Sequence, residues 1–244
     1  MNLTRDIFGD RPRFGILIDP DYEKDTRFEK LLGYLNEGMA DIVLVGGSTS
    51  ESDNIDRVIC KIREATQVPI LIFPGNVFQL SGRADALILP SLISGRNPDY
   101  LIGKHVEAAS IIHKSGIPVF SMGYILIEGG SQSATSYITQ TTPIPSDQYQ
   151  LAAQTALAGQ LLGMKCIYLE SGSGATHPAQ SEMIQDVKSV LNIPLIVGGG
   201  IREVHDLISA VEAGADMVVV GTIIEQYPDH IVTLYQAFAS HVAL

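Results

Sequence analysis

The chain of 244 residues has few cysteines and few positive charges. Its two cysteines, Cys60 and Cys166, are too few for a disulfide framework and suit a reducing compartment. Sixteen Lys and Arg against 27 Asp and Glu give a net charge of −11, which argues against the basic face of a nucleic-acid-binding protein. An anionic ligand would therefore have to be held locally, by backbone amides, a few cations or a metal ion.

Long apolar runs are also lacking. The opening stretch "MNLTRDIFGDRPRF" has no apolar segment of the kind that signal peptides contain. Elsewhere no apolar run approaches the roughly 18 residues that a membrane-spanning helix needs. Together with the two cysteines, these observations predict a cytoplasmic protein.

What the sequence does contain is an alternation of short apolar runs with longer amphipathic segments. The expected strands cover residues 14–19, 41–47, 69–75, 84–91, 118–126, 166–172, 194–200 and 216–222. The expected helices cover residues 26–38, 53–66, 98–115, 146–162, 178–191, 202–213 and 229–242. The strands are nearly continuous apolar runs, as expected for a parallel sheet buried on both faces.

Eight β/α steps in one domain, residues 1–244, predict a TIM (β/α)8 barrel. A doubly wound sheet competes less well, because "LIDPDYEKD" after the first strand carries no glycine-rich fingerprint. One step is irregular: only "NVFQLSGR", residues 76–83, separates the third strand from the fourth, too little for a covering helix. We therefore predict a modified barrel with a shortened or missing third helix. The gap could be covered by a loop packed through Phe78 and Leu80, by a partner subunit or by a long apolar ligand.

Glycine runs follow the three last strands, at the face of the barrel that carries active sites. They are Gly172-Ser173-Gly174, Gly198-Gly199-Gly200 and Gly221-Thr222. Free N–H groups at such strand ends and helix starts bind phosphate. Tight turns alone would explain one run well and three poorly, so we predict a phosphate site.

The same face offers acidic and hydroxyl side chains. Asp19 ends the first strand and Ser48 follows the second. A carboxylate together with a hydroxyl suits Mg²⁺. Capping of a turn by Asp19 and of a helix by Ser48 explains the two residues equally well. Glu170 ends the sixth strand beside the phosphate loop, where it could accept a proton from a ligand hydroxyl. Tyr168 points to the same side by strand parity, as a site residue or as a filler of the barrel.

In these motifs the chain resembles the geranylgeranylglyceryl phosphate synthases and their heptaprenyl relatives, a family of prenyltransferases in ether-lipid synthesis. The resemblance covers nearly the whole chain and depends on "LIDPD" (17–21), "VGGS" (45–48), "FPG" (73–75), "YLESGSGA" (168–175), "VGGGIR" (197–202) and "VVVGTIIE" (218–225).

The resemblance implies that sn-glycerol 1-phosphate is joined through its C3 hydroxyl to a polyprenyl diphosphate, with Glu170 and Tyr168 in catalytic roles. It implies Mg²⁺ at Asp19 and Ser48, peripheral contact with a membrane, and a homo-oligomer, either a dimer or a hexamer. The implied glycerol phosphate site consists of Tyr168, Leu169, Glu170, Ser171, Gly172, Ser173, Gly174, Gly199, Gly200, Gly221 and Thr222. An apolar trough for the prenyl chain is expected near the third and fourth strands, with Tyr100, Phe120 or Tyr124 among its floor residues.

Two other functions remain open from the residues alone. A phosphosugar isomerase would share the glycine runs but normally needs a second, well-placed acid or base. A non-catalytic phosphate or prenyl binder would keep the pockets and show no turnover.

Overall fold

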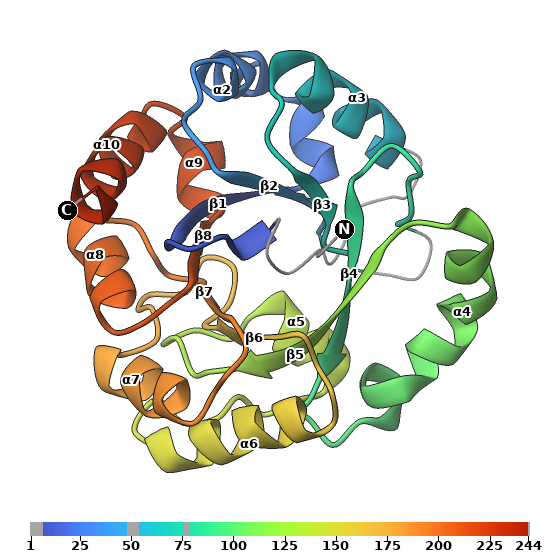
Figure 1. Ribbon diagram of the computed structural model, residues 1–244, viewed down its shortest axis with the longest axis vertical. Helices are drawn as coiled ribbons and strands as arrows, with labels where there is room; N and C mark the ends of the chain where they lie inside the picture. The colour runs from blue at the N-terminus through green and yellow to red at the C-terminus, as the bar shows by residue number, and fades with distance from the viewer. Residues whose placement is uncertain (1–6, 48–53, 76–78, 244) are drawn as a thin grey trace.

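The computed structural model describes residues 7–47, 54–75 and 79–243. In this part of the chain eight parallel strands close into a barrel in sequence order, each paired with the next and β8 with β1 (Figure 1). The strands are β1 (Arg13–Ile18), β2 (Ile42–Val45), β3 (Ile70–Ile72), β4 (Ala86–Leu92), β5 (Val119–Leu126), β6 (Cys166–Glu170), β7 (Leu195–Gly198) and β8 (Met217–Val220). The predicted TIM-type barrel is confirmed.

Helices follow the strands in the described residues, and most of them surround the barrel (Figure 1). They are η1 (Pro20–Lys24), α2 (Arg27–Asn36), α3 (Ile55–Ala65), η3 (Asp99–Gly103), α4 (Lys104–Ser115), α5 (Ala134–Thr139), α6 (Tyr149–Leu161), α7 (Ser181–Ser189), α8 (Val204–Glu212), α9 (Thr222–Gln226) and α10 (His230–Val242). All seven expected helices are present within a few residues of their predicted ends, whereas α5 was not predicted. Within the described ranges no helix is long and apolar enough to span a bilayer.

The continuous apolar strands serve two cores, one on each side of the sheet. In β2, Ile42 and Leu44 point into the barrel, while Val43 and Val45 pack against the helices. Such alternation with both faces buried is typical of parallel sheets covered by helices. The N-terminal end of the barrel is packed by Phe8, whose ring lies 5.7 Å from that of Phe120. Space for a ligand is therefore left at the C-terminal end.

The connection from β3 to β4 carries no helix over its described residues 79–85. Leu80 packs against the outer core as expected, while Phe78 lies outside the described residues. Gln79 is fully buried: its side-chain oxygen accepts from the Gly75 N–H at 2.8 Å, and its side-chain nitrogen donates to the Gly47 carbonyl at 3.1 Å. The connection thus ties together the loops that follow β2 and β3.

Candidate active site

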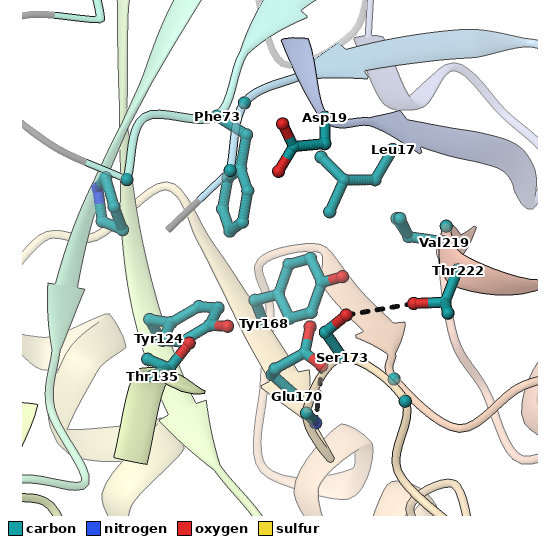
Figure 2. Close-up of a pocket in the computed structure, with 18 of the residues that line it drawn as sticks. Leu17, Asp19, Phe73, Tyr124, Thr135, Tyr168, Glu170, Ser173, Val219 and Thr222 are labelled. Carbon is teal, nitrogen blue, oxygen red and sulfur yellow. Dashed lines mark hydrogen bonds between the residues drawn. The ribbon is translucent and has the colours of Figure 1, made fainter. Parts of the chain in front are cut away.

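A cavity of about 260 Å³ opens at the C-terminal ends of the strands. Residues from almost every strand end contribute to it, and Figure 2 shows ten of them by name. The walls include Leu17, Asp19, Gly46, Gly47, Phe73, Tyr100, Tyr124, Thr135, Tyr168, Glu170, Gly172, Ser173, Gly174, Gly199, Gly200, Arg202, Gly221, Thr222 and Glu225. The cavity therefore collects nearly all the described residues that the sequence singles out.

One end of the cavity is lined by the loops after β6, β7 and β8. In the described part of the chain, the backbone N–H groups of Ser173, Gly174, Gly199 and Gly200 donate to no protein acceptor. The hydroxyls of Ser173 and Thr222 lie 3.0 Å apart and connect the β6 loop to the start of α9 (Figure 2). Unpaired N–H groups that converge on one place form an anion site, and this position is the usual phosphate site of the fold.

Gly199 lacks room for any side chain. An added Cβ would fall against Oε1 of Glu170, 2.6 Å from the Gly172 nitrogen and 2.8 Å from the Ser171 nitrogen. Its φ of 79° also lies in the left-handed region that favours glycine. The glycine is therefore required for the β7 loop to approach the β6 loop and its carboxylate.

Replacing Gly199 with alanine should lower both stability and anion binding. We expect a loss of about 2–4 kcal/mol in the free energy of unfolding, because overpacking adds to the left-handed strain. Gly38→Ala is the matched control, since Gly38 has the same φ of 79° and no atom within 4 Å of its added Cβ. It should lose only about 1 kcal/mol. Urea unfolding of both variants measures the difference, and equal losses would show that the close approach at Gly199 has no energetic consequence.

Glu170 lies at the inner edge of this anion site. The residue is 6% exposed, and its Oε1 accepts a hydrogen bond from the Gly172 N–H at 2.6 Å (Figure 2). Burial raises the pKa of Glu170 to about 7, against the opposing effect of hydrogen bonds from Gly172 and the Tyr168 side chain. A carboxyl group with a pKa near neutrality is well matched to proton transfer at physiological pH.

Three aromatic rings line the middle of the cavity. Phe73 stacks on Tyr168 with ring centroids 5.6 Å apart, and Tyr124 lies 5.5 Å from Tyr168 and 5.8 Å from Phe73. Burial raises the pKa of both tyrosines well above the usual value. The two tyrosines therefore stay neutral, and the three rings together provide an apolar wall (Figure 2).

Of the expected floor residues, Tyr100 and Tyr124 line the cavity and Phe120 does not. Phe120 is the second residue of β5, so it packs at the closed, N-terminal end of the barrel. Leu169 and Ser171 are buried but do not line the cavity, since strand parity directs Leu169 toward the outer core.

Asp19 lies on the opposite side of the aromatic wall from Glu170 (Figure 2). Its Oδ1 accepts from the Asp21 N–H at 2.9 Å, so it caps the turn η1, and it also lines the cavity. Burial raises the pKa of Asp19. Glu225 lines the cavity beside it and accepts from the Asp19 N–H at 2.9 Å.

A magnesium ion is compatible with this end of the cavity. The described residues contain no group of three acidic, histidine or cysteine side chains that could hold a metal ion. Mg²⁺ does not require such a group, because one or two carboxylates with substrate phosphate oxygens and water complete its shell. The half-buried carboxylate of Asp19 fits this requirement, while Ser48, the second expected ligand, lies outside the described residues.

Sequence reasoning did not single out three contributors to the cavity. Two of them are Arg202 and Glu225, which line the cavity. Both belong to the quoted runs "VGGGIR" and "VVVGTIIE", but neither was given a role. The helix α5 brings Thr135 to the wall, and its start is set by Ser133, whose hydroxyl accepts from the Ser136 N–H at 3.1 Å. A serine before a helix is an N-cap signal, so this short helix was detectable in the sequence.

Together the barrel, the unpaired N–H groups and the carboxylates define a TIM barrel with a candidate phosphate site and the side chains of an enzyme. A model of the PcrB family matches residues 7–239. The chain belongs to the PcrB family.

Three similar proteins share one name. The geranylgeranylglyceryl phosphate synthase of Spirosoma linguale is 44% identical over 230 residues, 94% of this chain and 92% of the relative. That of Flavobacterium johnsoniae is 46% identical over 210 residues, 86% of each chain. The crystal structure of (S)-3-O-geranylgeranylglyceryl phosphate synthase from Thermoplasma acidophilum in complex with sn-glycerol-1-phosphate is 30% identical, with a TM-score of 0.89 over 99% of this chain and 97% of that one.

Proposed function

We propose that this protein is a prenyltransferase that joins the C3 hydroxyl of sn-glycerol 1-phosphate to a polyprenyl diphosphate, geranylgeranyl diphosphate above all. The observation that carries the proposal is the division of one cavity into an anion site with Glu170, an aromatic wall and a separate carboxylate end at Asp19. Such a cavity suits two substrates that each carry an anionic group, one of them with an apolar chain. Family membership and the names of the relatives support the same reaction.

At the anion site, the backbone N–H groups of the β6 and β7 loops would bind the phosphate of glycerol 1-phosphate. This fixes the C3 hydroxyl beside Glu170, so that the two reactants meet in a defined orientation. Glu170 accepts the hydroxyl proton while the oxygen forms a bond to C1 of the prenyl chain. The C1–O bond breaks and diphosphate leaves with the bonding electrons, which yields an ether and a protonated Glu170.

At the other end, Asp19, with Ser48 as the second expected ligand, would hold Mg²⁺. When bound, the ion would neutralise charge on the diphosphate and make it a better leaving group. Glu225 fixes the backbone of Asp19, because the carboxylate of Glu225 accepts a hydrogen bond from the Asp19 N–H group. The side chain is held by the Asp21 N–H group, which donates to Oδ1 of Asp19, so the carboxylate keeps one direction where it lines the cavity.

The prenyl chain would lie along the aromatic wall. Phe73, Tyr100 and Tyr124 line the cavity on the side of β3 and β4, where the described connection carries no covering helix. An apolar wall near the reacting carbon also excludes water, which would otherwise hydrolyse the donor.

The test is to incubate the purified protein with Mg²⁺, geranylgeranyl diphosphate and either enantiomer of glycerol phosphate, and to detect the ether product by mass spectrometry. Ether from the sn-1 enantiomer alone, abolished by EDTA, supports the proposal. Failure with C20 and longer donors would overturn it. Binding of both ligands without turnover would indicate a non-catalytic phosphate or prenyl binder. Interconversion of a phosphosugar in the absence of metal would indicate an isomerase.

Peripheral contact with a membrane is part of this proposal, because donor and product are lipids. Tyr137 and Ile138 on α5 are 73% and 44% exposed, and Ile138 also lines the cavity. With a net charge of −11 we expect contact with neutral rather than anionic lipid. Flotation with phosphatidylcholine vesicles measures it. A cytoplasmic location fits the two free cysteines.

We also propose a homo-oligomer, a dimer or a hexamer. The surface of η3 and α4 supports it, since Ile102 is 59% and Val106 71% exposed, one helical turn apart. Among the residues of α4 only Ala108 is buried. Exposed apolar residues grouped on one helix mark contact surfaces. Light scattering of the purified protein gives the number of subunits.

A further inference from the structure

Arg202 occupies the short connection between β7 and α8 and reaches from there to the β6 loop. Its backbone is held at the start of α8, where Asp206 Oδ2 accepts from the N–H groups of Arg202 and Glu203 at 3.2 and 3.1 Å. Glu203 and Asp206 complete a capping box that fixes this end of the helix. The side chain of Arg202 thus extends from a rigid base.

The guanidinium group of Arg202 binds the β6 loop through two carbonyls. Its Nη2 donates to the carbonyl of Gly174 at 3.1 Å and to that of Ala175 at 2.9 Å. Ser173 and Gly174 are exposed, so side-chain packing does not hold this part of the loop. The two hydrogen bonds fix the carbonyl oxygens on the arginine, and the N–H groups of Ser173 and Gly174 remain without a protein acceptor in the described part of the chain.

Arg202 also matters for the charge of the cavity. It is the one cationic side chain among the described residues that line the cavity, against the carboxyl groups of Asp19, Glu170 and Glu225. Its Nε and Nη1 groups donate to no protein acceptor in the described ranges. A phosphate dianion at the anion site would find there the positive charge and the donors that backbone amides alone do not supply.

We propose that Arg202 is a positioning residue for the phosphate site: it holds the β6 loop in its anion-binding shape and places a positive charge beside it. The ligand class is a phosphomonoester dianion, and the inference depends on the proposed function for its identity as glycerol 1-phosphate. It assigns Arg202 to the phosphate end of the cavity only. The affinity for the prenyl donor should therefore be independent of it.

The test compares Arg202→Gln and Arg202→Lys with the control Arg63→Gln. Arg63 also donates to a backbone carbonyl, that of Val68 at 3.3 Å, but lies outside the cavity. Calorimetry gives the Kd of sn-glycerol 1-phosphate and of inorganic phosphate without any donor. Steady-state kinetics give the KM of each substrate.

We expect Arg202→Gln to raise the Kd and the KM for glycerol phosphate about 10- to 100-fold, since a charge-assisted interaction is lost, and to leave the KM of the donor unchanged. Arg202→Lys, which retains the charge, should recover part of the affinity, and Arg63→Gln should leave both affinities at the wild-type value. Unchanged phosphate affinity in folded Arg202→Gln, or equal losses for both substrates, would overturn the proposal. If no ether forms with the wild-type protein, the binding measurements still decide the role of Arg202.

Discussion

Replacing Glu170 with glutamine should lower kcat/KM about 10²- to 10⁴-fold, the usual contribution of a general base. Glutamine keeps the shape of the side chain and can still accept the hydrogen bond from the Gly172 N–H group, which lies 2.6 Å from Oε1. It cannot take a proton from the C3 hydroxyl. The expected loss therefore appears in kcat, while the KM for glycerol phosphate should change little, because the backbone N–H groups are proposed to hold the phosphate.

The pH dependence gives a second measurement of the same role. The pKa of Glu170 is raised to about 7 by burial, so the carboxyl group is protonated below that pH and ionised above it. A proton acceptor acts only when ionised. The kcat/KM of the wild-type protein should therefore fall about tenfold per unit below pH 7 and level off above it, since this parameter reports ionisations of the free enzyme.

The control for this prediction is Glu182→Gln, an exposed acid in the first turn of α7. It should retain wild-type kcat and the same pH profile. The residual activity of Glu170→Gln should lose the inflection near pH 7. A variant that keeps the inflection, or that keeps full kcat, would show that another group accepts the proton.

Much of the fold follows from local chemistry that is visible in the sequence. Strand runs such as "IVLV" of β2 are apolar at every position because both faces are buried, which identifies a parallel sheet without knowledge of any contact. Glycines such as Gly199 and Gly200 come directly after strands, and strand ends of a barrel meet at one face by topology. The gathering of these glycines at one cavity was therefore predictable.

Other parts of the site depend on side-chain direction, which spacing does not contain. Arg202 could equally have pointed to solvent, and its bonds to the Gly174 and Ala175 carbonyls depend on how the β6 loop turns. Glu225 falls in a five-residue helix and touches Asp19, which is 206 positions earlier in the chain. Phe120 was expected in the floor of the trough, but the register of β5 places it at the closed end of the barrel.

Replacing Asp19 with asparagine should abolish the response to magnesium and lower kcat/KM about 10³-fold, since several kcal/mol of charge stabilisation at the leaving group is lost. The amide oxygen of asparagine can still accept from the Asp21 N–H group, so the cap of η1 and the fold are retained. A smaller effect is expected on the affinity for glycerol phosphate, because its phosphate is proposed to bind to the N–H groups of the β6 and β7 loops rather than at Asp19.

Asp21→Asn is the matched control, because Asp21 lies two residues further on in the same turn. Its carboxylate is paired with Lys24 at 2.8 Å and does not line the cavity. Two measurements apply to both variants: the rise of the unfolding temperature with added MgCl₂ in the presence of inorganic diphosphate, and the magnesium concentration for half-maximal rate. Wild type and Asp21→Asn should show the same response to magnesium in both measurements. Asp19→Asn should show no response to magnesium in either. If Asp19→Asn responds like wild type, the carboxylate only caps the turn, and the magnesium ion is held by other residues or by the substrate alone.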